Sequence, residues 1–120
     1  MRVPRTRHAA AAVAAGASLL VAACSNAQTV KQTITAQTIG GKAGFSVAAL
    51  TVTHGSKVEL IVKNTTDRPH GFSIDELGVH RIVESAKPIT VRFTASRKGT
   101  FRIYCQLHPA HGTAELVVPQ

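Results

Sequence analysis

The residues with the clearest chemical potential lie close together near the C-terminal end of the chain. Cys105, His108 and His111 follow the spacing C-x2-H-x2-H within the stretch FRIYCQLHPAHGTAELVV. Thiolate and imidazole are the ligands that suit copper, zinc and related metals. Three such side chains on one short turn can face a single ion, so the spacing predicts a metal site.

A fourth candidate ligand, His70, lies far upstream in the stretch RPHGFSID. His70, Phe72 and Ile74 are every second residue of this stretch, and alternate side chains of a strand point to the same face. Cys105 shares its parity with the large apolar residues of the run 100–105. We therefore expect His70 and Cys105 to reach the same interior from two different strands.

The remaining histidines carry weaker signals. His54 lies in an expected turn and His80 lies beside an arginine, so both are predicted to be surface residues. Asp75 and Glu76 follow the strand of His70, but nothing pairs them as an acid and a base. The sequence contains no glycine-rich phosphate loop and no G-x-S-x-G nucleophile elbow. No catalytic residue is predicted, and a role other than that of an enzyme is favoured.

The elements that must position these residues are short strands. Alternating apolar and polar residues, interrupted by turn signals, predict extended segments. The segments are residues 29–38, 45–53, 57–63, 70–75, 88–94, 100–105 and 112–118. Residues 76–87 are less regular and are expected to form a wide loop or a brief helix. This pattern predicts an all-β protein, an antiparallel β-sandwich of about seven to eight strands in one domain.

The first 23 residues have the pattern of a bacterial signal peptide. Three arginines precede an apolar, alanine-rich run over residues 9–23, which is too short to span a bilayer. The run ends in LVAAC, which resembles the lipobox of bacterial lipoproteins and predicts that Cys24 is lipidated. Residues 24–29 would then be the lipidated cysteine and a short tether, and residues 30–120 the folded domain. Ordinary cleavage near Ala23 or Ala27, which would leave a soluble exported protein, is the alternative.

These features predict an exported protein of the cell envelope, lipid-anchored at the outer face of a membrane, either periplasmic or at the cell surface. If Cys24 is lipidated, Cys105 is the only thiol left, so no disulfide can form within the chain. An exposed free thiol would be a liability in an oxidising compartment. Ligation to a metal would protect Cys105.

The charge of the chain gives information about its partners. Removing the three arginines of the signal leaves 11 of the 14 Lys and Arg against 6 Asp and Glu, a net charge of +5. The basic residues are scattered and aromatic residues are few, so a nucleic acid partner is not expected. A mildly basic face could dock an acidic partner or an anionic membrane. An ordinary solvated surface explains the same charge.

An upstream histidine followed by Cys-x-x-His on the last turn resembles the pattern of the cupredoxins, the copper-binding β-sandwich family. The resemblance covers residues 45–118 and implies a Greek-key sandwich with one mononuclear copper site. The loop from Cys105 to His111 has the length of the amicyanin loop. The stretches HGFSIDELGV and FTASRKGTFRIYCQLHP look most like nitrosocyanin, the red copper protein of the family.

Two departures from these relatives concern the ligands. Nitrosocyanin has a glutamate at the position of His70 and a longer loop between its two histidines, and amicyanin has a methionine at the position of His111. The only methionine of this chain is Met1, which is removed with the signal, so no thioether ligand is available. The predicted ligands are at most His70, Cys105, His108 and His111. His111 lying in water at the loop rim, which would leave a three-ligand site, is the alternative.

The resemblance implies a function in electron transfer. In the family, the histidine of the Cys-x-x-His turn lies in an apolar surface patch and passes the electron to a redox partner protein. Here that residue would be His108, surrounded by Leu107, Pro109 and Ala110. A nitrosocyanin-like role in catalysis or in binding a small molecule such as nitric oxide is an alternative function. A copper carrier and a structural zinc site are further alternatives.

Overall fold

The structure is a computed structural model that describes residues 28–120, so the predicted signal peptide and the predicted lipidation of Cys24 lie outside the described residues. The described part contains nine strands and one short 3-10 helix, η1, and it has no helix long and apolar enough to cross a membrane. The strands and the helix, in chain order, are β1 (Thr29–Ile39), β2 (Lys42–Phe45), β3 (Ala49–Thr51), β4 (Lys57–Asn64), β5 (His70–Ile74), η1 (Asp75–Leu77), β6 (Val79–Val83), β7 (Ile89–Thr94), β8 (Gly99–Ile103) and β9 (Ala114–Val118).

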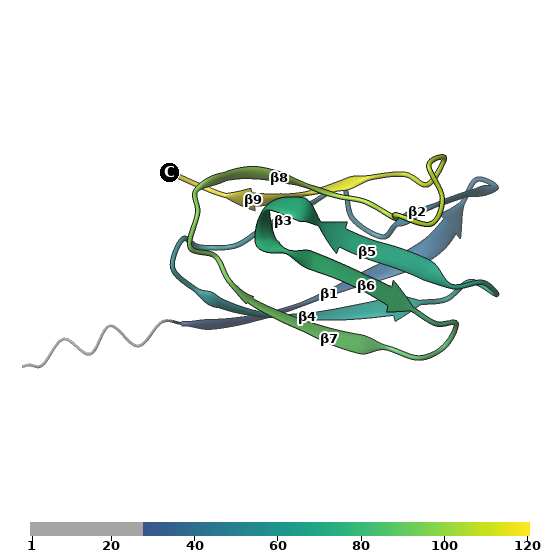
Figure 1. Cartoon of the computed structure of the whole chain (residues 1–120), viewed down its shortest axis with the longest axis horizontal. Helices are drawn as coiled ribbons and strands as arrows, with labels where there is room; N and C mark the ends of the chain where they lie inside the picture. Colours follow the sequence, from purple (N-terminus) through teal and green to yellow (C-terminus); the bar gives the residue numbers. More distant parts are fainter. Residues whose placement is uncertain (1–27) are drawn as a thin grey trace, which may run out of the picture.

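The strands form two packed layers. One layer is a four-stranded sheet in the order β2-β1-β4-β7. The other layer contains the three-stranded sheet β3-β9-β8 and the hairpin of β5 and β6. In Figure 1 this hairpin lies between β8 above and β4 and β7 below. The backbone of Ser73 in β5 pairs with that of Tyr104 just after β8, with N–H to O distances of 2.9 and 3.0 Å. This bridge attaches the hairpin that carries His70 to the strand that leads to Cys105.

The prediction of an all-β sandwich is confirmed, but the sheets are mixed rather than antiparallel. β1 pairs with β4 in parallel, and β3 pairs with β9 in parallel. The chain crosses to the other layer at β3 and returns at β4, so β1 and β4 are neighbours that no tight turn connects. Turn signals predict antiparallel pairing only for strands joined by a hairpin. The direction of these long-range pairs could not be derived from local patterns.

Nine strands are present where about seven to eight were expected. The segment predicted over residues 45–53 contains β3 and only the last residue of β2, a short strand that was not predicted and lies on a different sheet. The irregular stretch 76–87 contains the brief helix η1 and also β6, which was not predicted. Three consecutive residues of β6, from His80 to Ile82, are exposed. β6 therefore lacks the alternation from which the other strands were recognised.

The core lies between the two layers and consists of aliphatic and aromatic side chains from both. Every second residue of β4 is buried, as the alternating pattern predicted. Burying one such side chain stabilises the fold by about 1.5–3 kcal/mol. The most deeply buried large residues are Ile34, Leu60, Phe72, Ile74, Ile103 and Leu116. The packed core extends along β5 and β8 to one end of the sandwich, where the side chains of Cys105, His70 and His111 lie.

Candidate metal centre

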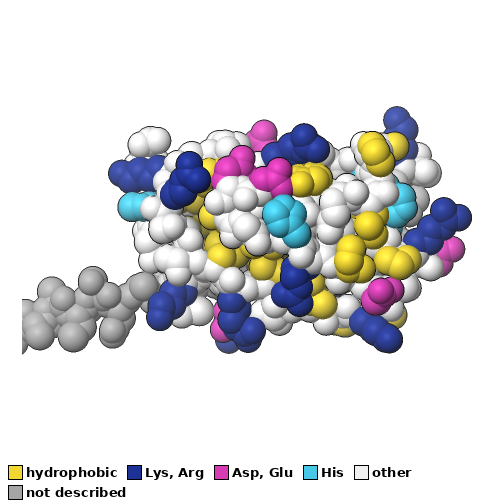
Figure 2. Space-filling model, viewed as in Figure 1, with side chains coloured by type: hydrophobic (Ala, Val, Ile, Leu, Met, Phe, Trp, Pro, Cys, Tyr) yellow, Lys and Arg dark blue, Asp and Glu magenta, His cyan; other side chains and the backbone are white. Residues whose placement is uncertain are grey.

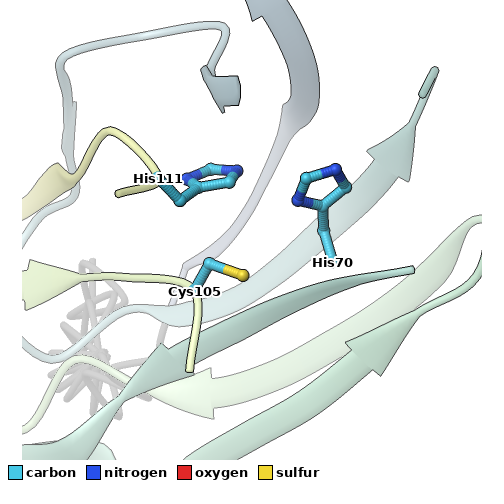
Figure 3. Close-up of side chains that lie close together, drawn as sticks. All are labelled: His70, Cys105 and His111. Carbon is cyan, nitrogen blue, oxygen red and sulfur yellow. The ribbon is translucent and has the colours of Figure 1, made fainter. Parts of the chain in front are cut away.

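Three predicted ligands meet at one end of the sandwich. His70 begins β5, Cys105 follows β8, and His111 lies in the loop between β8 and β9. One donor atom from each residue lies within 4.8 Å of the others, and the three side chains are only 4–5% exposed. Figure 3 shows the two imidazoles and the sulfur turned toward a common space. The arrangement fits a single ion.

His111 is held in place before any metal binds. Its Nδ1 lies 2.6 Å from the carbonyl oxygen of Gly112, so this nitrogen donates the bond and the tautomer is fixed. Its ring packs on Phe45 with a centroid distance of 4.6 Å. The loop is tied to β2 because the Gly112 N–H donates to the Ala43 carbonyl over 2.9 Å. The Nε2 atom of His111 is buried and has no hydrogen-bond partner among residues 28–120.

His70 has the same property at its other ring nitrogen. Its Nδ1 is buried and has no hydrogen-bond partner in the described part of the chain, and its ring centroid lies 4.9 Å from that of His111. Burial lowers the pKa of His70, and repulsion from His111 and His108 lowers it further, against a smaller opposing effect of Asp67. The ring is therefore neutral at neutral pH, which is the form that binds a metal.

Cys105 receives a backbone hydrogen bond from the strand of His70. The Gly71 N–H donates to the Cys105 sulfur over 3.1 Å, and both residues are buried. Sequence reasoning missed Gly71. A signal was present, because a glycine within a strand often marks a position where another part of the chain approaches closely.

His108 lies beside the cluster rather than in it. Its Nδ1 is 3.7 Å from the Cys105 sulfur and its ring centroid is 5.5 Å from that of His70, but the side chain is exposed. The structure thus brings together His70, Cys105 and His111, with His108 at their outer edge. Ligation by all four residues stays a prediction.

A depression of about 570 Å³ opens from the histidines to the surface. Its lining includes His70, His108 and His111, together with the basic residues Lys42 and Arg68. Figure 2 shows basic, hydrophobic and histidine side chains near one another at the end of the molecule away from the grey trace. A small molecule or a partner surface can approach the histidines from this side.

The two other described histidines are surface residues, as predicted. His54 Nε2 lies 3.1 Å from the Ser96 carbonyl, and His80 Nε2 lies 2.8 Å from the Asp75 carboxylate. Asp75 also accepts a 2.5 Å hydrogen bond from the Tyr104 hydroxyl. The bond from Tyr104 and, with a smaller effect, the bond from His80 lower the pKa of Asp75. The hydrogen bond to Asp75 raises the pKa of Tyr104.

Comparison with known proteins places the fold. The cupredoxin-like domain family matches residues 10–118, and no curated protein matches the chain. Auracyanin A, a blue copper protein from Chloroflexus aurantiacus, is 18% identical with a TM-score of 0.61, and the match covers 75% of this chain and 98% of auracyanin. The metal-binding domain of the Cu(I)-exporting P-type ATPase of Streptococcus pneumoniae D39 is 16% identical with a TM-score of 0.64. The match covers 79% of this chain and 89% of that domain.

Larger copper enzymes share the fold over part of their length. Copper nitrite reductase from Nitrosomonas europaea is 18% identical with a TM-score of 0.66, and the match covers 77% of this chain but 42% of the reductase. A multicopper oxidase is matched over 39% of its own length. The particular closeness to nitrosocyanin stays a prediction. The family match and the geometry agree: the chain belongs to the cupredoxin-like domain family, and its cluster of His70, Cys105 and His111 fits one mononuclear copper site.

Proposed function

We propose that this protein carries electrons through a mononuclear copper site, exported from the cell and held at the outer face of a membrane by lipids on Cys24. One observation carries the proposal for the site. Two imidazole nitrogens, His70 Nδ1 and His111 Nε2, are buried without partners next to a buried thiol. Buried polar atoms normally have hydrogen-bond partners, so these two are explained by a bound metal ion.

The residues around the site support electron transfer because they are held in position independently of the metal. His111 is fixed by the Gly112 carbonyl and Phe45, and Cys105 by the Gly71 N–H. Copper on a thiolate and imidazoles would cycle between Cu(I) and Cu(II). Ligands that the protein already holds need to move little during that change, which favours fast transfer.

The route to a partner runs through His108 in this proposal. His108 is exposed, and so are its apolar neighbours Leu107, Pro109 and Ala110, so apolar side chains flank a histidine whose Nδ1 lies 3.7 Å from the Cys105 sulfur. Exposed apolar surface around a functional group is typical of a transient docking site. The partner would be a redox protein whose own electron site can approach this end of the sandwich.

Copper loading tests the function directly. We expect one copper per chain, an intense visible absorption from the copper–thiolate bond, and a paramagnetic resonance signal that disappears and returns over repeated reduction and oxidation. Zinc would give no visible band. Loss of copper on reduction would favour a copper carrier instead of an electron carrier.

A second function is favoured by the depression beside the histidines. A space of about 570 Å³ reaches His70, His108 and His111 from the surface, so a small molecule could occupy a coordination position. Titrating the copper-loaded protein with azide or nitric oxide tests this alternative. A saturable change in the visible spectrum would support a binding or catalytic role, whereas an unchanged spectrum would support electron transfer alone.

The proposed anchor rests on the LVAAC sequence before and at Cys24. Two or more acyl chains hold a protein on a membrane far more firmly than one. We expect the wild-type protein in the membrane fraction and Cys24→Ala outside it. Equal solubility of the two proteins would contradict lipidation and favour ordinary cleavage near Ala23 or Ala27.

A further inference from the structure

Gln106 follows the predicted copper ligand Cys105 and connects two parts of the molecule. Its side-chain oxygen accepts a 2.7 Å hydrogen bond from the Ser73 hydroxyl in β5. Its side-chain nitrogen donates a 3.0 Å hydrogen bond to the Arg81 carbonyl in β6. The amide therefore uses both of its ends to hold the β5–β6 hairpin against the turn that carries Cys105.

The side chain of Gln106 lies directly over Gly71. A Cβ atom at position 71 would be 2.0 Å from the Gln106 oxygen and 2.8 Å from the Gln106 backbone nitrogen. These distances are far below van der Waals contact, so only glycine leaves room for the amide. Position 71 is thus occupied by the Gln106 side chain in place of a side chain of its own.

Gly71 is also the residue that donates to the Cys105 sulfur, over 3.1 Å. The amide of Gln106 therefore covers the backbone unit that fixes the thiol. Cys105, Gly71 and Ser73 are all buried, whereas Gln106 is exposed. Gln106 is consequently the outer layer between this part of the site and solvent.

We propose that Gln106 is a positioning residue: it clamps the turn of Cys105 onto β5, maintains the hydrogen bond from Gly71 to the sulfur, and keeps water and reagents from the thiol. Gln106 touches neither the metal nor a redox partner in this role. The effect on copper rests on the proposed function, whereas the effect on the metal-free thiol does not.

The clamp has a chemical consequence for each state of the protein. In the metal-free protein, the thiol is reached by reagents only when the turn opens. In the copper-loaded protein, a hydrogen bond to the thiolate lowers its donation to the metal and raises the reduction potential. Loss of the clamp should therefore make the thiol more reactive and lower the potential.

The test measures how fast the Cys105 thiol of the metal-free full chain reacts with an aromatic disulfide reagent. Cys24→Ala is included in every protein so that Cys105 is the only thiol. Gln106→Ala should react about 5- to 30-fold faster, the change that losing one or two hydrogen bonds makes in a local equilibrium. Gln106→Met, which keeps the bulk without the two bonds, should also react faster.

Gln32→Ala is the matched control. Gln32 also makes one side-chain hydrogen bond to a backbone carbonyl, that of Thr51, but it lies in β1, which supplies no predicted ligand. We expect its thiol reactivity to equal that of the parent. A rate for Gln106→Ala equal to that of Gln32→Ala would overturn the proposal. An acceleration explained entirely by a larger globally unfolded fraction, measured by thermal unfolding, would overturn it as well.

The copper-loaded proteins separate this inference from the proposed function. A lower reduction potential and a shifted thiolate absorption in Gln106→Ala would support both. Faster thiol reaction in a protein that binds no copper would refute the proposed function and leave the clamp intact. An unchanged thiol rate with normal copper binding would refute the clamp alone.

Discussion

Four of the five described histidines form two pairs with opposite surroundings. His54 and His80 are exposed, and each has a hydrogen-bond partner, the Ser96 carbonyl and the Asp75 carboxylate. His70 and His111 are buried, and each has a ring nitrogen for which the described residues supply no hydrogen-bond partner. The common expectation is the reverse, because a polar atom needs a protein partner most where water cannot reach it.

The contrast identifies where the fold without a metal loses stability. A buried unpaired polar atom costs about 1–3 kcal/mol. The chain places two such atoms next to the Cys105 thiol, which accepts the backbone hydrogen bond from Gly71. A metal ion bound between them would offset this cost, whereas the exposed histidines need no ligand. Four predictions follow from this contrast, beginning with the largest effect.

Cys105→Ser should abolish the intense visible absorption of the copper-loaded protein completely, because an oxygen ligand cannot give the copper–thiolate transition. The protein should still fold, since the serine oxygen can accept the Gly71 N–H. At a copper concentration 1,000 times the Kd, binding should raise the free energy of unfolding of the wild type by about 4 kcal/mol, and much less in the variant. Visible spectra and thermal unfolding measure both effects. Persistence of the colour would show that Cys105 is not the ligand.

His70→Ala should weaken copper binding by more than about 100-fold, the upper range for losing an outer partner of a ligand. His80→Ala is the control from the exposed group and should leave the Kd unchanged. Titration against a copper chelator measures both constants. Equal Kd values for the two variants would remove the distinction between the buried and the exposed histidines.

His111→Met should shift the absorption toward blue and raise the reduction potential, because a thioether binds more weakly than imidazole and favours Cu(II) less. The fixed Nδ1 and the buried, unpartnered Nε2 favour ligation by His111. Spectra and voltammetry of the variant measure the change. Wild-type values in His111→Ala would show that His111 does not bind the metal.

Asp75→Asn should have the smallest effect, seen only in the pH dependence of stability. The bonds from Tyr104 and His80 lower the pKa of Asp75 from its ordinary value of 3.8 in the folded state. The carboxylate therefore contributes stability above about pH 3.8, and this contribution is lost as the pH falls through the folded-state pKa.

Thermal unfolding over a pH series tests the role of Asp75. The variant should unfold at a lower temperature than the wild type near neutral pH, and the two should converge in acid. Glu76→Gln, which changes the neighbouring exposed carboxylate, is the control and should follow the wild type. A difference between Asp75→Asn and the wild type that is constant over all pH values would contradict the assignment.

Much of the fold was predictable because alternation is a local property. Parity correctly placed His70 and Cys105 in the interior, and it also placed the inward residues of β4. The alternation failed for Ser73, which lies between Phe72 and Ile74 and should therefore point outward but is fully buried. The cause is tertiary, since Tyr104 pairs with the backbone of Ser73 and Gln106 bonds its hydroxyl.

Part of the candidate site was predictable because its residues are close in the sequence. The part that depends on long-range contacts was not. The spacing of Cys105 and His111 on one turn restricts how far apart they can lie, so the sequence alone indicated that they meet. The bond from Gly71 to the sulfur joins residues 34 positions apart, and the two bonds of the Gln106 side chain span 33 and 25 positions. A glycine within a strand indicates a close approach at Gly71, but it does not indicate which residue approaches. The exposure of His108 likewise depends on the path of the folded loop.

The length of β1 sets the distance between the start of the described domain and the end that carries the histidines. β1 is 11 residues long, and at about 3.3 Å per residue it extends roughly 35 Å from Thr29 to Ile39. The depression that leads to the histidines is lined by Thr38, Gly41 and Lys42, at the far end of this strand. If lipids on Cys24 anchor the chain as proposed, the copper end would lie about one strand length from Thr29, where the described domain begins. A redox partner embedded in the same membrane would then have to contact the domain at the end opposite its point of attachment.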